Sequence, residues 1–249
     1  MKISVITVCY NAEETVENTI LSVLSQDYPN VEYIIIDGAS KDGTLEIVER
    51  YRDRLAQWVS EPDKGIYDAM NKGIALATGD IIGLLNADDI YAHTGVLSEV
   101  AAAMRSESLD AVYADVDYFD GAHPDKAVRH YSSAYFKPSR MAWGFVPAHP
   151  TLFLRREIYQ KFGYFKTNYR IAGDYDLIAR IFKDGTLRYR YLPKVLVRMR
   201  LGGASTRSWH SMLRQNTEVI RACHENGIYT NWLMILAKYP VKFLGLVFK

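Results

Sequence analysis

Ile81-Ile82-Gly83-Leu84-Leu85-Asn86-Ala87-Asp88-Asp89 is an apolar run that ends abruptly in amide and acidic side chains. A buried strand with such side chains at its carboxyl end is how an open α/β sheet presents a metal or phosphate site. Two adjacent carboxylates repel each other unless a cation or a hydrogen-bond donor compensates them. We therefore expect the functional site at the end of this strand, with Asp88 at its centre.

Strands and helices alternate around this stretch. Apolar residues recur at helical spacing in several segments, and short runs rich in Val and Ile separate them. That order predicts βαβ units, and therefore an α/β fold with a mostly parallel sheet flanked by helices. Gly79 is placed to cap the C-terminal end of one helix. The expected strands are Ile3–Val8, Val31–Ile36, Gln57–Val59, Ile81–Leu85 and Ala111–Ala114, and the expected helices are Ala12–Gln26, Thr44–Arg54, Ile66–Ala77 and Gly95–Arg105.

The second half of the chain is less regular. Periodicity fades between Tyr118 and Pro150, where Pro and aromatic residues become frequent, which indicates loops and short strands lining a cleft. Beyond it we expect helices at Glu157–Phe162, at Asp174–Lys183 and from Trp209, with a strand at Arg188–Leu192. We divide the chain into a nucleotide-binding half (1–115), an acceptor-binding half (116–205) and a helical tail (206–249).

The last segment of the tail, Trp232–Lys249, is strongly apolar with spaced lysines. Lys238, Pro240 and Lys242 interrupt it too often for a membrane span. Two interpretations stay open. The segment is an amphipathic helix lying at a membrane surface, with aromatic and lysine side chains at the headgroups, or it caps the core or an oligomer contact.

Composition narrows the function classes. The 249 residues, 49% of them hydrophobic, suffice for one large domain or a domain with an appendage. A net charge of +1 and the lack of a long Lys/Arg block argue against nucleic acid as a partner. Cys9 and Cys223 lie far apart and fit neither a disulfide framework nor a zinc spacing. With no signal-peptide pattern after Met1, we expect a protein of the reducing cytoplasm.

Acidic residues follow other predicted strands as well. Asp37 comes after Val31–Ile36, and Asp63 after Gln57–Val59. Because the carboxyl ends of parallel strands share one edge, we expect these side chains to converge with Asp88. Asp42 is better explained as a turn or capping residue. The carboxylates suit Mg²⁺ or Mn²⁺, which typically takes one or two of them together with the phosphates of a substrate, so a diphosphate ligand follows.

These segments together resemble family 2 glycosyltransferases, which have the GT-A fold. The ordered set of motifs is far more specific than any one piece, and it extends to about residue 205. The matching segments are Val5–Asn11, Asp37–Thr44, Asp63–Gly73, Ala77–Asp80, Asn86–Asp89, Ala148–Phe153, Gly173–Leu177 and Arg200–Ser205.

The resemblance implies roles for the acidic edge. Tyr10, Asn11 and Asp37 would hold the base and ribose of a nucleotide, with Asp63 and Lys64 near the base or the diphosphate.

Asp88 would be the metal-binding carboxylate of the family's D-x-D motif, with Asp89 beside it as a substrate-binding residue. Asn86 replaces the usual first Asp. An amide can still accept a hydrogen bond from a ribose hydroxyl or from metal-bound water, but it brings no charge, so we expect a weaker metal site.

The resemblance also implies that Asp174 is the general base, with Gly173 where Glu is often found. Such a carboxylate takes the proton of the attacking hydroxyl as the anomeric carbon is displaced in line, and one base with one metal implies inversion. Asp174 could also cap its helix. For Asp176 we consider two roles equally, orienting the base or capping the same helix.

Other candidates are less specific. His149 could contact the acceptor or the diphosphate, or be a buried structural histidine. Arg200 with Gly202-Gly203 could bring a cation and backbone amides to a diphosphate, although a glycine turn explains the pair almost as well. Aromatic residues could stack on acceptor sugars but are more often core; they are Tyr131, Phe136, Trp143 and Phe145.

We therefore expect an inverting glycosyltransferase that uses a nucleotide-diphospho-sugar, most simply a UDP-sugar, with Mg²⁺ or Mn²⁺. By analogy with the family, the acceptor is a growing glycan on a lipid diphosphate in surface polysaccharide assembly, at the inner face of the cell membrane. A sugar-phosphate nucleotidyltransferase would need a Gly-rich basic loop after the first strand, where Glu13-Glu14 is acidic instead. A non-catalytic nucleotide-sugar-binding or scaffold protein is the other alternative, because of Asn86.

Overall fold

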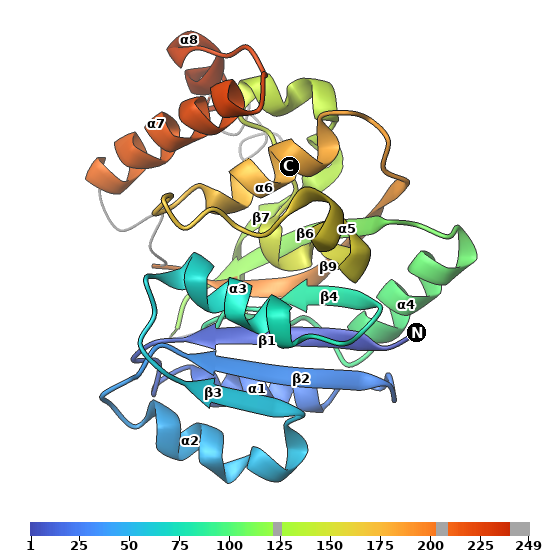
Figure 1. The fold of residues 1–249 in the computed structure, drawn as a ribbon, viewed down its shortest axis with the longest axis vertical. Helices are drawn as coiled ribbons and strands as arrows, with labels where there is room; N and C mark the ends of the chain where they lie inside the picture. Colours follow the sequence, from blue (N-terminus) through green and yellow to red (C-terminus); the bar gives the residue numbers. More distant parts are fainter. Residues whose placement is uncertain (122–125, 203–208, 240–249) are drawn as a thin grey trace.

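One mixed sheet runs through the molecule (Figure 1). The computed structural model describes residues 1–121, 126–202 and 209–239, and within them the strand order is β3-β2-β1-β4-β8-β6-β9-β5, with β7 paired to β6. The strands are β1 (Ile3–Cys9), β2 (Val31–Asp37), β3 (Gln57–Ser60), β4 (Ile81–Leu84), β5 (Ile90–Tyr91), β6 (Ala111–Phe119), β7 (Ala127–Tyr131), β8 (Phe153–Arg155) and β9 (Tyr189–Arg200).

Halfway across the sheet, the pairing of the strands changes from parallel to mixed. Strands β1 to β4 pair parallel to one another, as the βαβ pattern predicted. β8 is antiparallel to both β4 and β6, whereas β6 and β9 are parallel. The α/β class and the GT-A fold are thus confirmed, and the four parallel strands place their carboxyl ends at one edge.

Helices cover both faces of the sheet. They are α1 (Val16–Leu24), α2 (Thr44–Arg50), α3 (Ile66–Leu76), α4 (Val96–Ser106), α5 (Arg156–Phe162), α6 (Gly173–Phe182), α7 (Trp209–Glu225) and α8 (Trp232–Leu236). Side chains alternate along β1, so that Ile6 and Val8 share one core with α3 and α6. Ile3 and Val5 share the other core with α1 and α4.

Two strands are longer than expected. β6 continues past Ala114 to Phe119, and β9 continues past Leu192 to Arg200. The register skips Pro193 and Lys194, because Ala114 pairs with Leu192 and the next residue of β6 pairs with Val195. A bulge therefore removes Pro193 from the hydrogen-bonded ladder. The strand predicted from the sequence ended just before this proline, because proline cannot donate to a ladder.

Gly79 does not cap α3, and this prediction was wrong. The cap residue is Ala77 in extended backbone. A Cβ at Gly79 would lie 2.5 Å from Ser4 Oγ and 2.9 Å from Lys2 O, so the glycine allows the chain to enter β4 close against β1. Its N–H donates to Ser4 Oγ, which donates to buried Glu32. This contact fixes the start of the strand that leads to Asp88.

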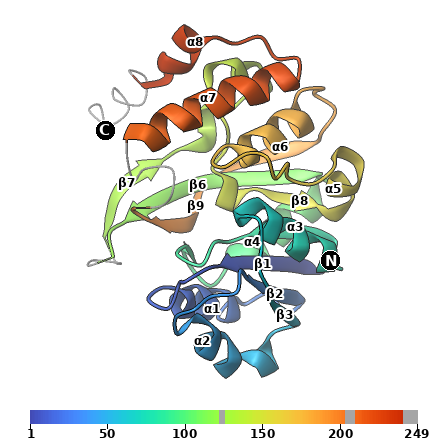
Figure 2. The ribbon, with the colours of Figure 1, turned by 60° about the vertical axis from the view of Figure 1, so that its left-hand side comes forward.

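The C-terminal helices are part of the packed body. α7, expected from Trp209, packs on α6, and Val219, Ala222 and Cys223 are buried there. Both α7 and α8 lie at the end of the molecule away from β1–β3 (Figure 2). Ile235 of α8 is buried, whereas Leu233 is 81% exposed. Residues 240–249 of the segment considered as a membrane anchor lie outside the described residues, and no helix within the described ranges is long and apolar enough to cross a membrane.

Candidate active site

The loops after β1 and β2 are tied together. Asn11, in the left-handed region at φ 48°, donates its N–H to Ser40 Oγ (2.8 Å) and accepts the N–H of Lys41 on Oδ1 (2.9 Å). Asp42 forms the expected turn, with Thr44 N–H donating to its Oδ1 (3.1 Å). Tyr10 keeps 62% of its surface exposed. The pair of loops therefore presents Tyr10 outward from a rigid base.

Asp37 is buried beneath these loops. Its Oδ2 accepts hydrogen bonds from Ser40 N–H (2.9 Å) and Ser60 Oγ (2.7 Å), and Ser40 Oγ donates to Oδ1. Both oxygens are thus engaged within the chain. The structure shows Asp37 organising the edge of the sheet, and its direct contact with a nucleotide stays a prediction.

Tyr10 and Asp63 meet across Gly38. A Cβ at Gly38 would overlap Asp63 Oδ2 and lie 3.3 Å from the Tyr10 ring, so only glycine permits this approach. The other oxygen of Asp63 accepts Gly65 N–H (2.8 Å) at the entrance to α3. The next residue, Lys64, is exposed and lines a cavity of about 480 Å³ with Arg170 and their neighbours. The ends of β1, β2 and β3 thus meet at one edge, whereas the convergence of Asp37 and Asp63 with Asp88 stays a prediction.

Asp89 turns into the fold. It is 1% exposed, and its Oδ2 accepts a hydrogen bond from Asn86 Nδ2 (3.3 Å). Burial raises the pKa of Asp89 well above its usual range, the charge of Asp88 raises it further, and hydrogen bonds from Asn86 and the Arg200 backbone partly oppose this. In this structure the Asp89 side chain connects the end of β4 to β9 and orients Asn86, and its contact with a substrate stays a prediction.

Asn86 and Asp88 belong to the same turn after β4, and both are partly exposed. Asp88 is half-buried. Asn86 Oδ1 is buried and accepts no hydrogen bond from the described part of the chain. A buried amide oxygen without a donor beside a carboxylate fits a hard divalent cation. No cluster of three or more acidic, His or Cys ligands exists among the described residues, so such a cation would need phosphate oxygens to complete its shell.

Asp174 lies in the first turn of α6, close to Tyr67 of α3. Ala172 is the cap residue of that helix, without a side-chain cap bond, so Asp174 is not the cap. Its Oδ1 accepts Tyr175 N–H (2.8 Å). Burial raises the pKa of Asp174 above its ordinary value, while the His149 charge, backbone N–H groups and Tyr67 partly oppose the shift. A carboxylate with a raised pKa is a better proton acceptor once ionised.

His149 and Tyr67 stand beside Asp174. Burial lowers the pKa of His149, and the charge of Asp174 partly opposes this. Its ring lies edge-on to Phe165, with centroids 5.7 Å apart. The Tyr67 hydroxyl donates to Ile171 O (2.5 Å) just before α6. The sequence predicted a role for His149 but named no residue that it contacts. In the structure it lies near Asp174, the candidate base.

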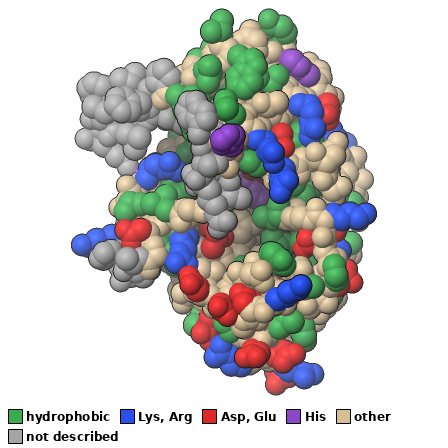
Figure 3. Space-filling model, turned by 90° about the vertical axis from the view of Figure 1, so that its left-hand side faces the viewer, with side chains coloured by type: hydrophobic (Ala, Val, Ile, Leu, Met, Phe, Trp, Pro, Cys, Tyr) green, Lys and Arg blue, Asp and Glu red, His purple; other side chains and the backbone are tan. Residues whose placement is uncertain are grey.

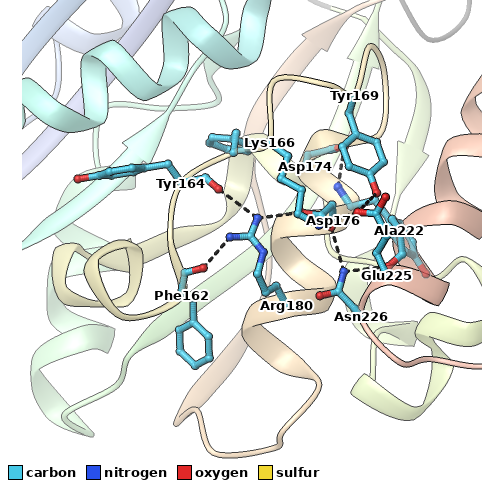
Figure 4. Close-up of polar contacts among 12 residues, drawn as sticks. Phe162, Tyr164, Lys166, Tyr169, Asp174, Asp176, Arg180, Ala222, Glu225 and Asn226 are labelled. Atoms are coloured by element: carbon cyan, nitrogen blue, oxygen red, sulfur yellow. Dashed lines mark hydrogen bonds and ion pairs between the residues drawn. The ribbon is translucent and has the colours of Figure 1, made fainter.

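Asp176 neither orients the base nor caps α6, so both expected roles were wrong. It is fully buried, and Figure 4 shows Arg180 and Asn226 converging on it. Lys166 Nζ lies 2.9 Å from Oδ1, Arg180 Nη2 lies 2.8 Å from Oδ2, and Asn226 Nδ2 donates to Oδ1 (2.9 Å). Two residues along a helix point about 200° apart, which takes Asp176 away from Asp174 and into the interface with α7.

Arg200 ends β9 at the acidic edge. Its backbone bonds to Asp89, its guanidinium lies 3.8 Å from Glu14 and it passes beside Gly121, where a Cβ would approach within 2.5 Å. Gly202 has φ +99°, as a glycine turn requires. Residues 203–205 of the same motif lie outside the described residues.

The aromatic candidates divide between core and cleft. Phe136 is buried and packs edge-on against Phe182, so it belongs to the core. The Tyr131 hydroxyl donates to Val146 O (2.7 Å). Trp143 stays 43% exposed. Of the four aromatics, Trp143 alone keeps a large exposed surface for a ligand.

The side chains segregate on the face that carries this edge (Figure 3). Acidic side chains gather over the lower part, where the loops after β1–β3 lie, and hydrophobic side chains cover the opposite end at α7 and α8. Exposed residues there are Tyr229, Trp232, Leu233 and Leu236.

Sequence reasoning missed Tyr67 and Glu218. Tyr67 occupies an apolar position of α3 and gives no signal of its own, and Glu218 sits in a helix far along the chain. Glu218 accepts the N–H groups of Ile171 (2.8 Å) and Ala172 (2.9 Å). Only the packing of α3 and α7 around the start of α6 brings both residues to Asp174.

An α/β sheet with acidic side chains at the carboxyl edge of its parallel strands is typical of nucleotide-binding enzymes. The chain belongs to glycosyl transferase family 2, whose profile matches residues 4–163. It is 30% identical over 179 residues to a PGL/p-HBAD biosynthesis glycosyltransferase of Mycobacterium bovis, covering 70% of this chain and 67% of that protein. It is 31% identical over 205 residues to the putative glycosyltransferase EpsE of Bacillus subtilis, covering 80% and 73%.

Solved structures share the fold. S. aureus TarS in complex with UDP-GlcNAc superposes with a TM-score of 0.69 at 20% identity, covering 88% of this chain and 67% of TarS. The mannosyltransferase PcManGT of Pyrobaculum calidifontis, in complex with GDP-Man and Mn²⁺, gives 0.66 at 21% identity, covering 90% and 63%. The chain thus spans about two thirds of these relatives. The family assignment favours an enzyme over the scaffold and nucleotidyltransferase alternatives.

Proposed function

We propose that this protein transfers a sugar, with inversion, from a UDP-sugar to a hydroxyl group of a glycan acceptor. The observation that carries this proposal is the position of Asp174: a half-buried carboxylate in the first turn of α6, beside His149 and Tyr67, with its pKa raised by burial. Its role follows from general base chemistry. Asp174 accepts the proton of the attacking hydroxyl while the sugar leaves the diphosphate on its opposite side.

The nucleotide would lie along the loops after β1–β3. Tyr10 offers an exposed ring for the base, while Asn11, Asp63 and Lys64 surround it with polar groups. Asp88 and Asn86 Oδ1 would hold Mg²⁺ or Mn²⁺ together with the diphosphate. The bound cation would neutralise the charge of the departing nucleoside diphosphate, so no leaving-group acid is needed.

The first test is calorimetric titration with UDP, GDP and CDP, each with Mn²⁺ and then with EDTA. We expect UDP to bind with Mn²⁺ and to lose about tenfold or more in affinity with EDTA, because one carboxylate and an amide hold no cation tightly by themselves. Asp88→Asn should behave with Mn²⁺ as the wild type does with EDTA. Asp53→Asn, at a fully exposed side chain, is the control. Absence of binding by all three nucleotides would reject the transferase proposal, and binding indifferent to EDTA would reject the metal site.

We further propose that the acceptor is a lipid-diphosphate-linked glycan in surface polysaccharide assembly, met at the inner face of the membrane. The exposed side chains of Tyr229, Trp232 and Leu233 at the α8 end support this, since aromatic and apolar groups on one face suit the interfacial region. The protein should co-sediment with anionic vesicles. The double variant Trp232→Ser/Leu233→Ser should bind the vesicles about tenfold more weakly, because two large apolar groups leave the interface. Equal retention of both forms would reject this contact.

A further inference from the structure

The side chain of Glu218 in α7 binds the backbone of residues 170–172, the segment that leads into α6. Its Oε2 accepts the N–H groups of Ile171 (2.8 Å) and Ala172 (2.9 Å), and the Arg170 N–H lies 3.1 Å from Oε1. These three consecutive amides precede the first residue of the helix. The first N–H groups of a helix lack partners within it, and a carboxylate at that end is stabilised by the helix dipole. Glu218 supplies such a partner for the N–H of Ala172, the cap residue, and it also binds the two N–H groups that precede the cap.

The same segment is held from its other side. The Tyr67 hydroxyl of α3 donates to Ile171 O (2.5 Å), so the peptide between Ile171 and Ala172 is fixed at its C=O by α3 and at its N–H by Glu218 of α7. Gly173 completes the fit, because a Cβ there would lie 2.7 Å from the Tyr67 ring. Asp174 follows immediately, and any shift of the segment moves its carboxylate relative to Tyr67 and His149.

α7 does not depend on Glu218 for its own docking. Ala222 and Cys223 are fully buried against the core, and Asn226, just after the helix, donates to Asp176 (2.9 Å). Glu225, two turns along α7, bonds Lys166 (2.7 Å) and Tyr169 but none of the three amides. Removing the Glu218 carboxylate should therefore free the segment without detaching the helix.

We propose that Glu218 is a positioning residue for the transfer reaction: by fixing the backbone of residues 170–172 it sets the place of Asp174 relative to the attacking hydroxyl. The inference rests on the proposed function, because Glu218 acts through Asp174. A misplacement of about 1 Å in a reacting group can cost about 100-fold in rate. The family profile ends at residue 163, so this role gives the C-terminal helix a part in the chemistry.

The test compares Glu218→Ala, Glu218→Gln and Glu225→Gln with the wild type. We expect Glu218→Ala to lower kcat by about 100-fold and to leave the Kd for UDP within about twofold. Glu218→Gln keeps one oxygen for the amides and should recover about tenfold of that loss, since a neutral acceptor bonds less strongly than a carboxylate. Glu225→Gln should retain kcat within about threefold because it leaves the amides bound. Hydrogen exchange at Ile171 and Ala172 should quicken in Glu218→Ala alone.

Three results would overturn the role. The first is a kcat equal to that of the wild type in both Glu218→Ala and Glu218→Gln. The second is a fall of kcat in Glu225→Gln as large as that in Glu218→Ala. The third is a fall of kcat in Glu218→Ala that is accompanied by an equally large loss of UDP affinity. If Glu218→Ala does not fold, the contrast between Glu218→Gln and Glu225→Gln decides alone. Asp174→Asn, measured alongside, separates the two proposals. An inactive Asp174→Asn with a fully active Glu218→Ala rejects only the positioning role, whereas a fully active Asp174→Asn rejects Asp174 as base and the positioning role with it.

Discussion

Asp174→Asn should reduce sugar transfer by about 10²- to 10⁴-fold, the usual contribution of a general base. The amide has the shape of the carboxylate but cannot take a proton from the acceptor hydroxyl. It can still accept Tyr175 N–H, so the start of α6 should keep its geometry. UDP affinity, measured by calorimetry, should remain unchanged, because the nucleotide residues lie on other loops.

The pH dependence of kcat/KM in the wild type tests the role of Asp174 in a second way. Burial raises the pKa of Asp174, and the base must be ionised to work, so kcat/KM should fall on acidification at a pH above the range of an ordinary aspartate. Asp184→Asn, an exposed carboxylate just beyond the same helix, should alter neither rate nor profile. Full activity in Asp174→Asn would show that another group takes the proton.

Asp176→Ala should lower the free energy of unfolding by about 3 kcal/mol, the lower end of the cost of removing one partner from a buried ion pair. Asp176 is 0% exposed and is shared by Lys166, Arg180 and Asn226. Without it, Arg180 keeps only the carbonyl groups of Phe162 and Tyr164, and its charge lacks a counter-ion among the described contacts. A fall of Tm by about 5–10 °C is expected for a chain of this size.

The comparison for Asp176 is Glu225→Gln. Glu225 pairs with the same Lys166, but both side chains are 36% exposed, and exposed pairs contribute about 0–1 kcal/mol. In thermal unfolding followed by circular dichroism, the Tm of Glu225→Gln should therefore lie within a few degrees of the wild-type Tm and well above the Tm of Asp176→Ala. Equal Tm values for the two variants would mean that the buried network adds no more stability than a surface pair.

Local sequence signals were sufficient where a residue's role depends on its own strand or turn. The parallel strands β1–β4 follow from apolar runs separated by amphipathic helices, and the meeting of the ends of β2 and β3, with Asp37 and Asp63, follows from strand direction. The Asp42 turn is likewise confirmed by its bonds to Thr44. The length of β9 was missed because Pro193 ends a strand in most contexts, whereas here a bulge removes it from the ladder.

Asp88, Asp89, Asp174 and Asp176 show the limit of such signals. By itself the sequence determined the α/β class, the family and the edge where carboxylates gather, because period, turn chemistry and strand order are properties of neighbouring residues. Only the tertiary structure decided that Asp89 and Asp176 are buried while Asp88 and Asp174 stay partly exposed. Which carboxylate finds a donor depends on residues more than forty positions away, such as Glu218 of α7 and Asn226 just after it. Desolvation and hydrogen bonding act through those contacts, and no local pattern encodes them.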